Sequence, residues 1–306
     1  MEQIDDSIRV IVLMSTYNGD RFLSEQLNSL LEQDFRNVDV LIRDDGSSDR
    51  TEDVLKKYSH KYPSIKWFSG GINLKPAHSF FNLIQRVSED YDFYFFCDQD
   101  DIWMPDKISM AVGSFKSGNN LPALYYCATE LVDANLNHIG YDFREYKYTS
   151  DVEYSFLRGS LITGCTICFN KALMNALKLY APLRMSMHDA WVHLLCLSIG
   201  GEIIADPCAH IKYRQHVSNV LGIHKMSLYE RLKNGLRKKT IYRDMASQII
   251  HEYDCVTAKS FHFMSLYVNY DRSLWNTIRF VKYVCNQRYT LTSRIYISLK
   301  ILLNLY

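Results

Sequence analysis

Residues 98–101, with the sequence DQDD, place three carboxylates within four positions, directly after the apolar run Tyr91–Cys97. Carboxylates this close repel one another strongly unless a cation lies among them. Oxygen-rich groups of this kind favour Mg²⁺ or Mn²⁺, which also bridge phosphates. The alternative is a solvated helix start that Asp101 caps. The position at the end of a strand favours the metal site.

A second acidic stretch, Asp44–Asp49 with the sequence DDGSSD, follows the apolar run Val38–Arg43. Its carboxylates and turn N–H groups could bind a base and a ribose. Asp, Gly and Ser are also the usual residues of turns and helix caps, which explains Gly46–Thr51 better than the two adjacent acids before it. No Gly-x-Gly-x-x-Gly follows the first apolar run, which disfavours a dinucleotide-binding Rossmann enzyme.

Four short apolar runs predict parallel strands that are covered on both faces. Segments with helical periodicity separate them, and this alternation predicts βαβ units and an α/β fold with a mostly parallel sheet. Polar clusters at Thr16–Asn18, Asp44–Asp49 and Asp98–Asp101 each follow a strand, so we expect them to converge at the ligand-binding edge of the sheet. The predicted strands are Arg9–Ser15, Val38–Arg43, Ile65–Phe68 and Tyr91–Cys97, and the predicted helices cover 22–31, a segment through Val54, Leu55 and Tyr58, and about 77–88.

Charge divides the chain near residue 224. Residues 1–224 carry 21 Lys and Arg against 29 Asp and Glu, a net charge of −8, whereas residues 225–306 carry 14 against 5, a net charge of +9. We therefore expect a main unit over 1–224, with halves of about 8–110 and 111–224, and a basic helical appendage over 225–306. The predicted elements of this part are strands near 123–128, 162–169 and 202–206 and helices over 189–199, 226–253 and 273–303.

Composition limits the class of protein. The chain has 306 residues, of which 47% are hydrophobic and 23% charged, and this excludes collagen-like and wholly disordered chains. A net charge of +1 argues against a nucleic-acid partner. The eight cysteines show no framework spacing, and the pair Cys165 and Cys168 lies in an expected buried strand, so we predict reduced structural thiols. Residues 1–6 lack a basic signal-peptide region and no stretch approaches a membrane span, so we expect a cytoplasmic protein.

Three motifs, in this order and spacing, resemble glycosyltransferase family 2: LMSTYNGD at 13–20, DDGSSDRT at 44–51 and CDQDDIWMPDK at 97–107. The match covers roughly residues 8–220 and is most similar to bacterial rhamnosyltransferase-like members. The resemblance implies a GT-A fold, which is a Rossmann-like sheet with flanking helices. It also implies transfer of a sugar from a nucleotide donor with inversion at the anomeric carbon, and no activity for residues 225–306.

The resemblance further implies roles for single residues at matching positions. Asp189 stands where the family has its catalytic base, and His188 replaces the Glu that precedes the base in many members. The other implied sites are nucleotide-sugar binding by Thr16, Tyr17, Asn18, Asp44, Asp45, Asp98 and Gln99, metal binding (Mn²⁺ or Mg²⁺) by Asp100 and His216, and weaker acceptor or diphosphate contacts by Gly164, His188, Trp191 and Arg214.

The implied chemistry is consistent with these residue types, although each has a structural alternative. Inversion needs one base and no covalent nucleophile, and a single carboxylate can take the proton of an acceptor hydroxyl. Asp189 could instead cap a helix over 190–199. The remaining alternatives are packed or surface histidines for His188 and His216, a surface ion pair for Arg214, and core aromatics rather than sugar-stacking rings for Trp103 and Trp191.

The C-terminal segments near 232–243 and 294–306 combine basic and apolar residues. This pattern is typical of helices that lie on an anionic membrane surface. The alternative is a helical appendage that packs on the main unit or on a second copy in a homodimer.

The function we expect is an inverting, metal-dependent glycosyltransferase at the inner face of the plasma membrane. It would move L-rhamnose from a nucleoside-diphosphate donor to a hydroxyl of a bacterial surface glycan, such as a capsule or O-antigen repeat, free or lipid-linked. The nearest alternative is a uridine-diphosphate hexose donor. A nucleotidyltransferase is disfavoured because no Gly-rich triphosphate loop is evident, and a catalytically silent scaffold is disfavoured by the presence of Asp98, Asp100 and Asp189.

Overall fold

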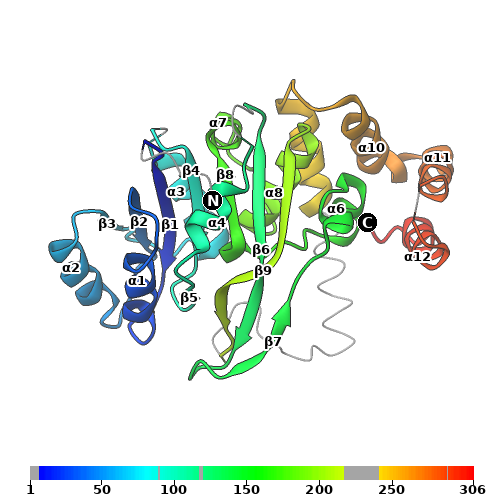
Figure 1. Cartoon of the computed structure of the whole chain (residues 1–306). Coiled ribbons are helices and arrows are strands. Elements are labelled where there is room, and N and C mark those ends of the chain that lie inside the picture. The colour runs from blue at the N-terminus through cyan, green and yellow to red at the C-terminus, as the bar shows by residue number, and fades with distance from the viewer. Residues whose placement is uncertain (1–6, 89, 117–119, 217–240, 288) are drawn as a thin grey trace.

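The computed structural model describes residues 7–88, 90–116, 120–216, 241–287 and 289–306 (Figure 1). Its strands are β1 (Val10–Thr16), β2 (Val38–Asp44), β3 (Ile65–Ser69), β4 (Phe93–Cys97), β5 (Ile102–Trp103), β6 (Ala123–Val132), β7 (His138–Asp142), β8 (Ile167–Asn170) and β9 (Glu202–Arg214). These nine strands of the described residues form one sheet in the order β3-β2-β1-β4-β8-β6-β9-β5, and β7 pairs with β6 outside this path. The predicted α/β class is confirmed.

Helices cover both faces of this sheet (Figure 1). They are α1 (Leu23–Leu31), α2 (Thr51–Lys61), α3 (Lys75–Arg86), α4 (Lys107–Gly113), α5 (Tyr146–Thr149), α6 (Val152–Arg158), α7 (Lys171–Leu179), α8 (His188–Ser198), α10 (Ala258–Asn269), α11 (Leu274–Cys285) and α12 (Leu291–Leu302), with 3-10 turns η1 (Gly164–Thr166) and η2 (Tyr270–Arg272). Residues 241–252 are also helical. The buried hydrophobic residues form two separate clusters, one on each face of the sheet.

The N-terminal half of the sheet is parallel throughout. β1 pairs in parallel with both β2 and β4, so that Val10 lies opposite Val38 and Phe93. Alternate residues of β1 point to opposite faces: Val12 lies in the core under α1, α2 and α4, and Leu13 lies in the core under α3, α7 and α8. A strand that is buried on both faces has no polar position, which is why residues 10–14 of β1 are all apolar.

The second half of the sheet mixes directions. β8 runs antiparallel to β4 and β6, whereas β6 and β9 are parallel. The prediction of one strand over 162–169 is wrong at its start, because residues 164–166 form the 3-10 turn η1 and the strand begins at Ile167. Thr166 closes this turn by donating its N–H and its hydroxyl to the carbonyl of Thr163, at 3.0 and 2.7 Å. An apolar run alone does not reveal such a turn.

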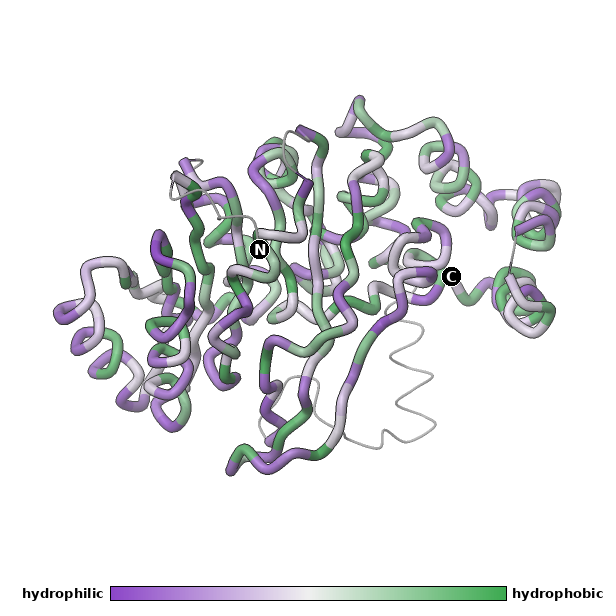
Figure 2. Tube along the Cα trace, in the orientation of Figure 1, coloured by the Kyte–Doolittle hydropathy of each residue, from purple (hydrophilic) through white to green (hydrophobic). Residues whose placement is uncertain are grey.

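The C-terminal helices share the core of the sheet. Met245, Phe263, Phe280 and Ile297 belong to the same buried cluster as the residues of α3 and α8. The predicted helical segment 273–303 is divided, because Thr290 caps a new helix by accepting the N–H of Ser293 at 3.3 Å. Helix α10 has no counterpart in the prediction, and the expected boundary at residue 224 lies outside the described residues. Figure 2 shows hydrophobic residues along both α11 and α12.

No helix among the described residues has both the length and the hydropathy needed to cross a membrane.

Candidate active site

The first polar cluster, after β1, is joined to the cluster after β4 by one side chain. Gln99 accepts the N–H of Tyr17 at 2.9 Å and donates to the Tyr17 carbonyl at 3.1 Å. A Cβ atom at Gly19 would lie 2.2 Å from the Gln99 amide oxygen, so any larger residue at position 19 would displace this amide. Tyr17 itself is 46% exposed.

The first cluster is also joined to the second cluster, which follows β2. Asn18 donates its N–H to the Ser47 hydroxyl at 2.9 Å and accepts the N–H of Ser48 at 2.8 Å. Asn18 has a φ of 47°, a left-handed conformation that Asn tolerates better than most residues. All three clusters therefore meet at the carboxyl edge of the parallel strands, as the sequence predicts.

The adjacent acids Asp44 and Asp45 are buried and direct their oxygens to the protein. Asp44 accepts the N–H groups of Gly46 and Ser47 at 3.1 and 2.9 Å and the hydroxyl of Thr16 at 3.1 Å. Asp45 pairs with Arg43. It also accepts the N–H groups of Leu74 and Lys75, each at 2.9 Å, at the start of α3. Both carboxylates thus hold the loop in place through hydrogen bonds to backbone N–H groups.

The cluster after β4 divides into two parts. The Asp100 carboxylate lies 2.7 Å from the Nε2 atom of His216, which follows β9. Asp101 is fully buried and accepts the backbone N–H of Arg214 at 3.0 Å, so it does not cap a helix, and β5 follows it directly. Its other oxygen has no N–H or O–H partner among the described residues.

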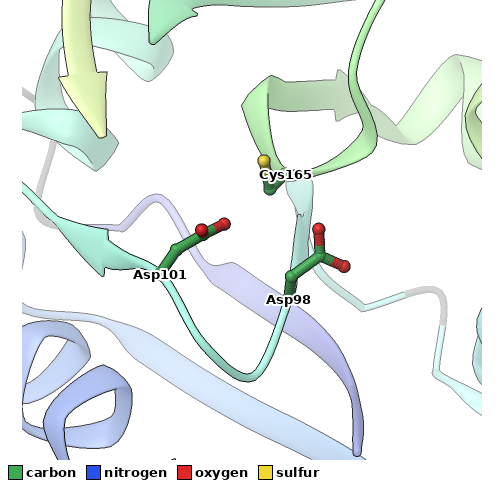
Figure 3. A group of neighbouring side chains, drawn as sticks. All are labelled: Asp98, Asp101 and Cys165. Atoms are coloured by element: carbon green, nitrogen blue, oxygen red, sulfur yellow. The ribbon is translucent and has the colours of Figure 1, made fainter. Parts of the chain in front are cut away.

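Asp101 shares its site with Asp98 and Cys165 (Figure 3). One ligand atom from each of the three lies within 4.8 Å of the others. Burial, together with the charges of Asp100 and Asp189, raises the pKa of Asp98 to about 7. Burial and the neighbouring carboxylates also raise the pKa of Asp101 well above its usual value. Negative charge is therefore costly here, and a cation or a proton would relieve it.

Cys165, which its sequence context predicts to be a structural thiol in a strand, is the site residue that sequence reasoning missed. It is buried in η1, and burial with the nearby Asp101 and Asp98 raises the pKa of its thiol well above the usual value. A protonated thiol beside two carboxylates is a weak hydrogen-bond donor to them. Only the pairing of β8 with β4 brings residue 165 to this loop, so no local signal could have found it.

Arg214 holds the acidic loop from β9. Its guanidinium donates to the Asp100 carbonyl and the Ala134 carbonyl, each at 2.7 Å, and to Glu25 at 2.5 Å. The side chain is 1% exposed and lies 4.3 Å from the Phe22 ring centre. The structure thus places this side chain in a buried network, which excludes the alternative of a surface ion pair.

Asp189 lies at the start of α8, beside η1. The helix is preceded by Met187 in extended conformation, so Asp189 is its second residue and not its cap. Its carboxylate accepts the N–H of Ala190 at 2.6 Å. Burial raises the pKa of Asp189 to about 6, although the N–H groups of Ala190 and Gly164 oppose the shift.

His188 precedes this carboxylate and is buried between two aromatic rings. Its ring stacks on Phe80 at 4.0 Å and meets the edge of Phe96 at 4.7 Å. Burial lowers the pKa of His188 to about 3, so the ring is neutral at physiological pH. Where a Glu would add a second negative charge beside Asp189, His188 adds none.

The two tryptophans that could stack on a sugar lie in the core. Trp191 has no exposed surface and Trp103 is 2% exposed. Trp191 belongs to the core under α8 and Trp103 to the core under α1 and α4. Both tryptophans are therefore core aromatics, which is the alternative to sugar-stacking rings.

Replacing Gly164 by Ala should damage this site. The added Cβ would lie 2.8 Å from His188 Nε2, and the ring between Phe80 and Phe96 has no room to retreat. Overpacking of this kind costs about 1–3 kcal/mol, so we expect the free energy of unfolding in urea to fall by that amount. Gly113→Ala is the control, because a Cβ added there would have no atom within 4 Å. Equal stability of the two variants would contradict the prediction.

Comparisons with known proteins give consistent results. The family model "Glycosyl transferase family 2" matches residues 11–175. A dTDP-rhamnosyl transferase, RfbG, of Shigella flexneri is 29% identical over 260 residues, which cover 77% of this chain and 83% of that protein. An uncharacterised glycosyltransferase of Rickettsia typhi is 25% identical over 252 residues, covering 80% and 76% of the two chains.

Solved structures have the same fold at low identity. S. aureus TarS 1–349, in complex with UDP-GlcNAc, is similar with a TM-score of 0.59 and 15% identity, over 90% of this chain and 80% of that chain. The mannosyltransferase PcManGT from Pyrobaculum calidifontis, in complex with GDP-Man and Mn²⁺, is similar with a TM-score of 0.56 and 15% identity, over 99% and 82%.

Proposed function

We propose a reaction for this chain from an established premise: it belongs to glycosyltransferase family 2, and it is a glycosyltransferase with the GT-A fold. The proposed reaction is the inverting transfer of a sugar from a nucleoside diphosphate to an acceptor hydroxyl. One observation carries this proposal: η1 lies between the two groups. A Cβ built on Gly164 would lie 3.6 Å from the Cβ of Asp189, and the next residue, Cys165, lies in one cluster with Asp98 and Asp101 of the acidic loop. A base and a donor site therefore share one edge of the sheet.

The nucleotide would lie along the loops after β1, β2 and β4. We propose that Tyr17, which is exposed, and Asp98 contact the nucleoside, with Gln99 fixing the position of Tyr17. Thr16, Asn18, Asp44 and Asp45 would act by shaping these loops, because their polar groups already bond to the protein. Residues 1–224 would form the catalytic unit, with the nucleotide half at about 8–110 and the acceptor half at about 111–224.

The residues near Asp100 are suited to a divalent ion. The Asp100 carboxylate and His216 Nε2 lie 2.7 Å apart and offer oxygen and nitrogen ligands, which fit Mn²⁺ or Mg²⁺. When bound, such an ion would neutralise charge on the departing diphosphate. Arg214 would act as a positioning residue, since it fixes the Asp100 carbonyl and the Asp101 carboxylate.

The reaction itself needs little from the protein beyond placement and one base. The acceptor oxygen attacks the anomeric carbon, the bond from that carbon to the diphosphate oxygen breaks, and the hydroxyl proton passes to Asp189. Attack opposite the leaving group inverts the configuration. The pKa of about 6 leaves Asp189 mostly ionised at neutral pH and still basic enough to accept a proton. The neutral ring of His188 and Gly164 would border the acceptor.

The donor we propose is deoxythymidine-diphosphate L-rhamnose. It is supported by the dTDP-rhamnosyl transferase of Shigella flexneri, to which the chain is 29% identical. A uridine-diphosphate hexose is the second candidate. The acceptor would be a hydroxyl of a bacterial surface glycan, such as a capsule or O-antigen repeat, free or lipid-linked, met at the cytoplasmic face of the membrane. The presence of Asp98, Asp100 and Asp189 argues against a catalytically silent scaffold.

A thermal unfolding series tests the donor proposal. Each nucleoside diphosphate is added with Mn²⁺ and then with a chelator, and a ligand at 100 times its Kd should stabilise the fold by about 2.7 kcal/mol. We expect deoxythymidine diphosphate with Mn²⁺ to give the largest shift. A larger shift with uridine diphosphate would indicate a uridine-diphosphate sugar as the donor instead. No shift with any diphosphate would contradict a donor site at this edge.

A further inference from the structure

The C-terminal helices α11 and α12 form the edge of the molecule opposite α2 (Figure 1). They pack against each other, and α11 also packs against α10. Their inward sides are apolar, as packing requires: Phe280 and Val284 of α11 and Ile297 and Ile301 of α12 are buried. The nucleotide and metal sites proposed above lie on other elements, so these helices need a separate explanation.

The exposed sides of the same two helices also carry several large apolar residues. Trp275 is 66% exposed and Leu291 is 72% exposed. A helix on the surface of a globular protein normally turns polar residues outward, and exposed apolar patches mark interaction sites. We call the following exposed apolar residues the C-terminal apolar surface: Leu274, Trp275 and Ile278 of α11, Leu291, Ile295, Leu299 and Leu302 of α12, and Leu303, which directly follows α12.

The charge of this segment limits what can cover the surface. Residues 273–306 contain five Lys and Arg and no Asp or Glu. Of these basic residues, Arg279 and Lys282 of α11 are exposed. A second copy docked through the same face would bring the same two basic residues against them, with no acidic residue of the segment to pair with them. A bilayer that contains anionic lipids offers both an apolar interior and negative charge.

A polar groove beside the apolar residues fits the same partner. It has a volume of about 240 Å³, lies between α10 and α11, and is lined by His262, Ser265, Leu266, Asn269, Asn276 and Arg279. Asn269 and Asn276 use their side-chain N–H groups on backbone carbonyls, at 2.8 and 3.0 Å. Among the described residues, Arg279 has neither a hydrogen bond nor an ion pair, so its guanidinium is available to a phosphate.

We propose that α10–α12 dock on an anionic lipid bilayer, with the C-terminal apolar surface at the acyl boundary and Arg279 at a headgroup phosphate. This inference does not depend on the donor or on Asp189. It would place the glycosyltransferase on the membrane by a surface contact that needs no spanning helix.

Flotation of the full chain with vesicles tests the proposal. We expect binding to vesicles of phosphatidylcholine mixed with phosphatidylglycerol, and much weaker binding to phosphatidylcholine alone. Each basic side chain near such a surface contributes about fivefold, so Arg279→Gln with Lys282→Gln should reduce partition about 25-fold. Trp275→Glu with Leu299→Glu should reduce it by about tenfold or more.

The matched control changes exposed leucines elsewhere. Leu121 and Leu183 are 58% and 80% exposed and lie outside the C-terminal helices, so Leu121→Glu with Leu183→Glu should leave partition unchanged. All variants should keep the wild-type unfolding temperature and nucleotide binding. Equal binding to neutral vesicles, or unchanged binding of the Trp275→Glu, Leu299→Glu variant, would overturn the proposal. So would a wild-type dimer that this variant dissociates, detected by light scattering, without vesicle binding.

Discussion

Asp189→Asn should lower kcat for sugar transfer by about 10²–10⁴-fold, the usual contribution of a general base. The amide keeps the shape of the carboxylate and can still accept the N–H of Ala190, so α8 should begin as before. It cannot accept the proton of the acceptor hydroxyl. Binding of the nucleoside diphosphate, measured by calorimetry, should be unchanged, because the donor loops lie on β1, β2 and β4.

The matched control is Asp142→Asn, which makes the same chemical change at a partly exposed carboxylate that pairs with Arg144. It should leave both kcat and nucleotide binding as in the wild type. If Asp189→Asn turned over as fast as this control, Asp189 would not be the base. If it lost nucleotide binding as well, the effect would be on the fold of the site rather than on proton transfer.

The pH dependence of the wild-type rate gives a separate prediction. Burial raises the pKa of Asp189 to about 6, and the residue acts as a base only when it is deprotonated. The rate should therefore rise with pH up to about 6, by about tenfold per pH unit on the acidic side, and then level off. A rate that is flat between pH 5 and 7 would be inconsistent with this assignment. The residual activity of Asp189→Asn should not show this fall in rate below about pH 6.

The convergence of the donor loops could be predicted because it needs only local information. Each loop follows an apolar run, and the carboxyl ends of parallel strands meet at one edge whatever the details of packing. The contacts of Gln99 with Tyr17 and of Asn18 with Ser47 are the result. The helix starts of α1 and α3 were likewise close to prediction, because helical periodicity is a property of neighbouring residues.

The contacts that complete the site could not be predicted from the sequence pattern, because they join segments that are distant in the chain. The family resemblance implies a role for Arg214 but not its contact with Asp101. Cys165 reaches Asp98 only through the pairing of β8 with β4, and Arg214 reaches Asp101 only through the pairing of β9 with β5. Mixed and antiparallel pairing in this half leaves no regular pattern in the sequence. The placement of Trp191 in the core is a similar case, since a helix buried on all sides has no polar face to reveal its orientation.

The second large effect is expected at Asp100. Asp100→Asn should abolish the difference between Mn²⁺ and chelator in nucleotide binding and should reduce transfer by at least about 100-fold. The amide is neutral, so it holds a divalent ion less well beside His216, whose Nε2 lies 2.7 Å from the carboxylate. The negative charge on the departing diphosphate would then not be neutralised by a divalent ion. Calorimetry with and without Mn²⁺ measures the metal dependence of nucleotide binding, and the initial rate measures sugar transfer.

Asp101→Asn is the discriminating control, because the structure groups Asp101 with Asp98 and Cys165 and not with His216. The amide oxygen can still accept the N–H of Arg214, so the loop should keep its shape. Burial raises the pKa of Asp101, so at a pH above the ordinary pKa of an Asp the folded state is disfavoured by the need to ionise this buried group. Removing the charge should therefore leave the chelated protein at least as stable at pH 7. Metal-dependent binding should survive in Asp101→Asn and be lost in Asp100→Asn. The reverse result would move the metal to the group of Asp98, Asp101 and Cys165, where a thiol would join the ligands and a softer ion would be favoured.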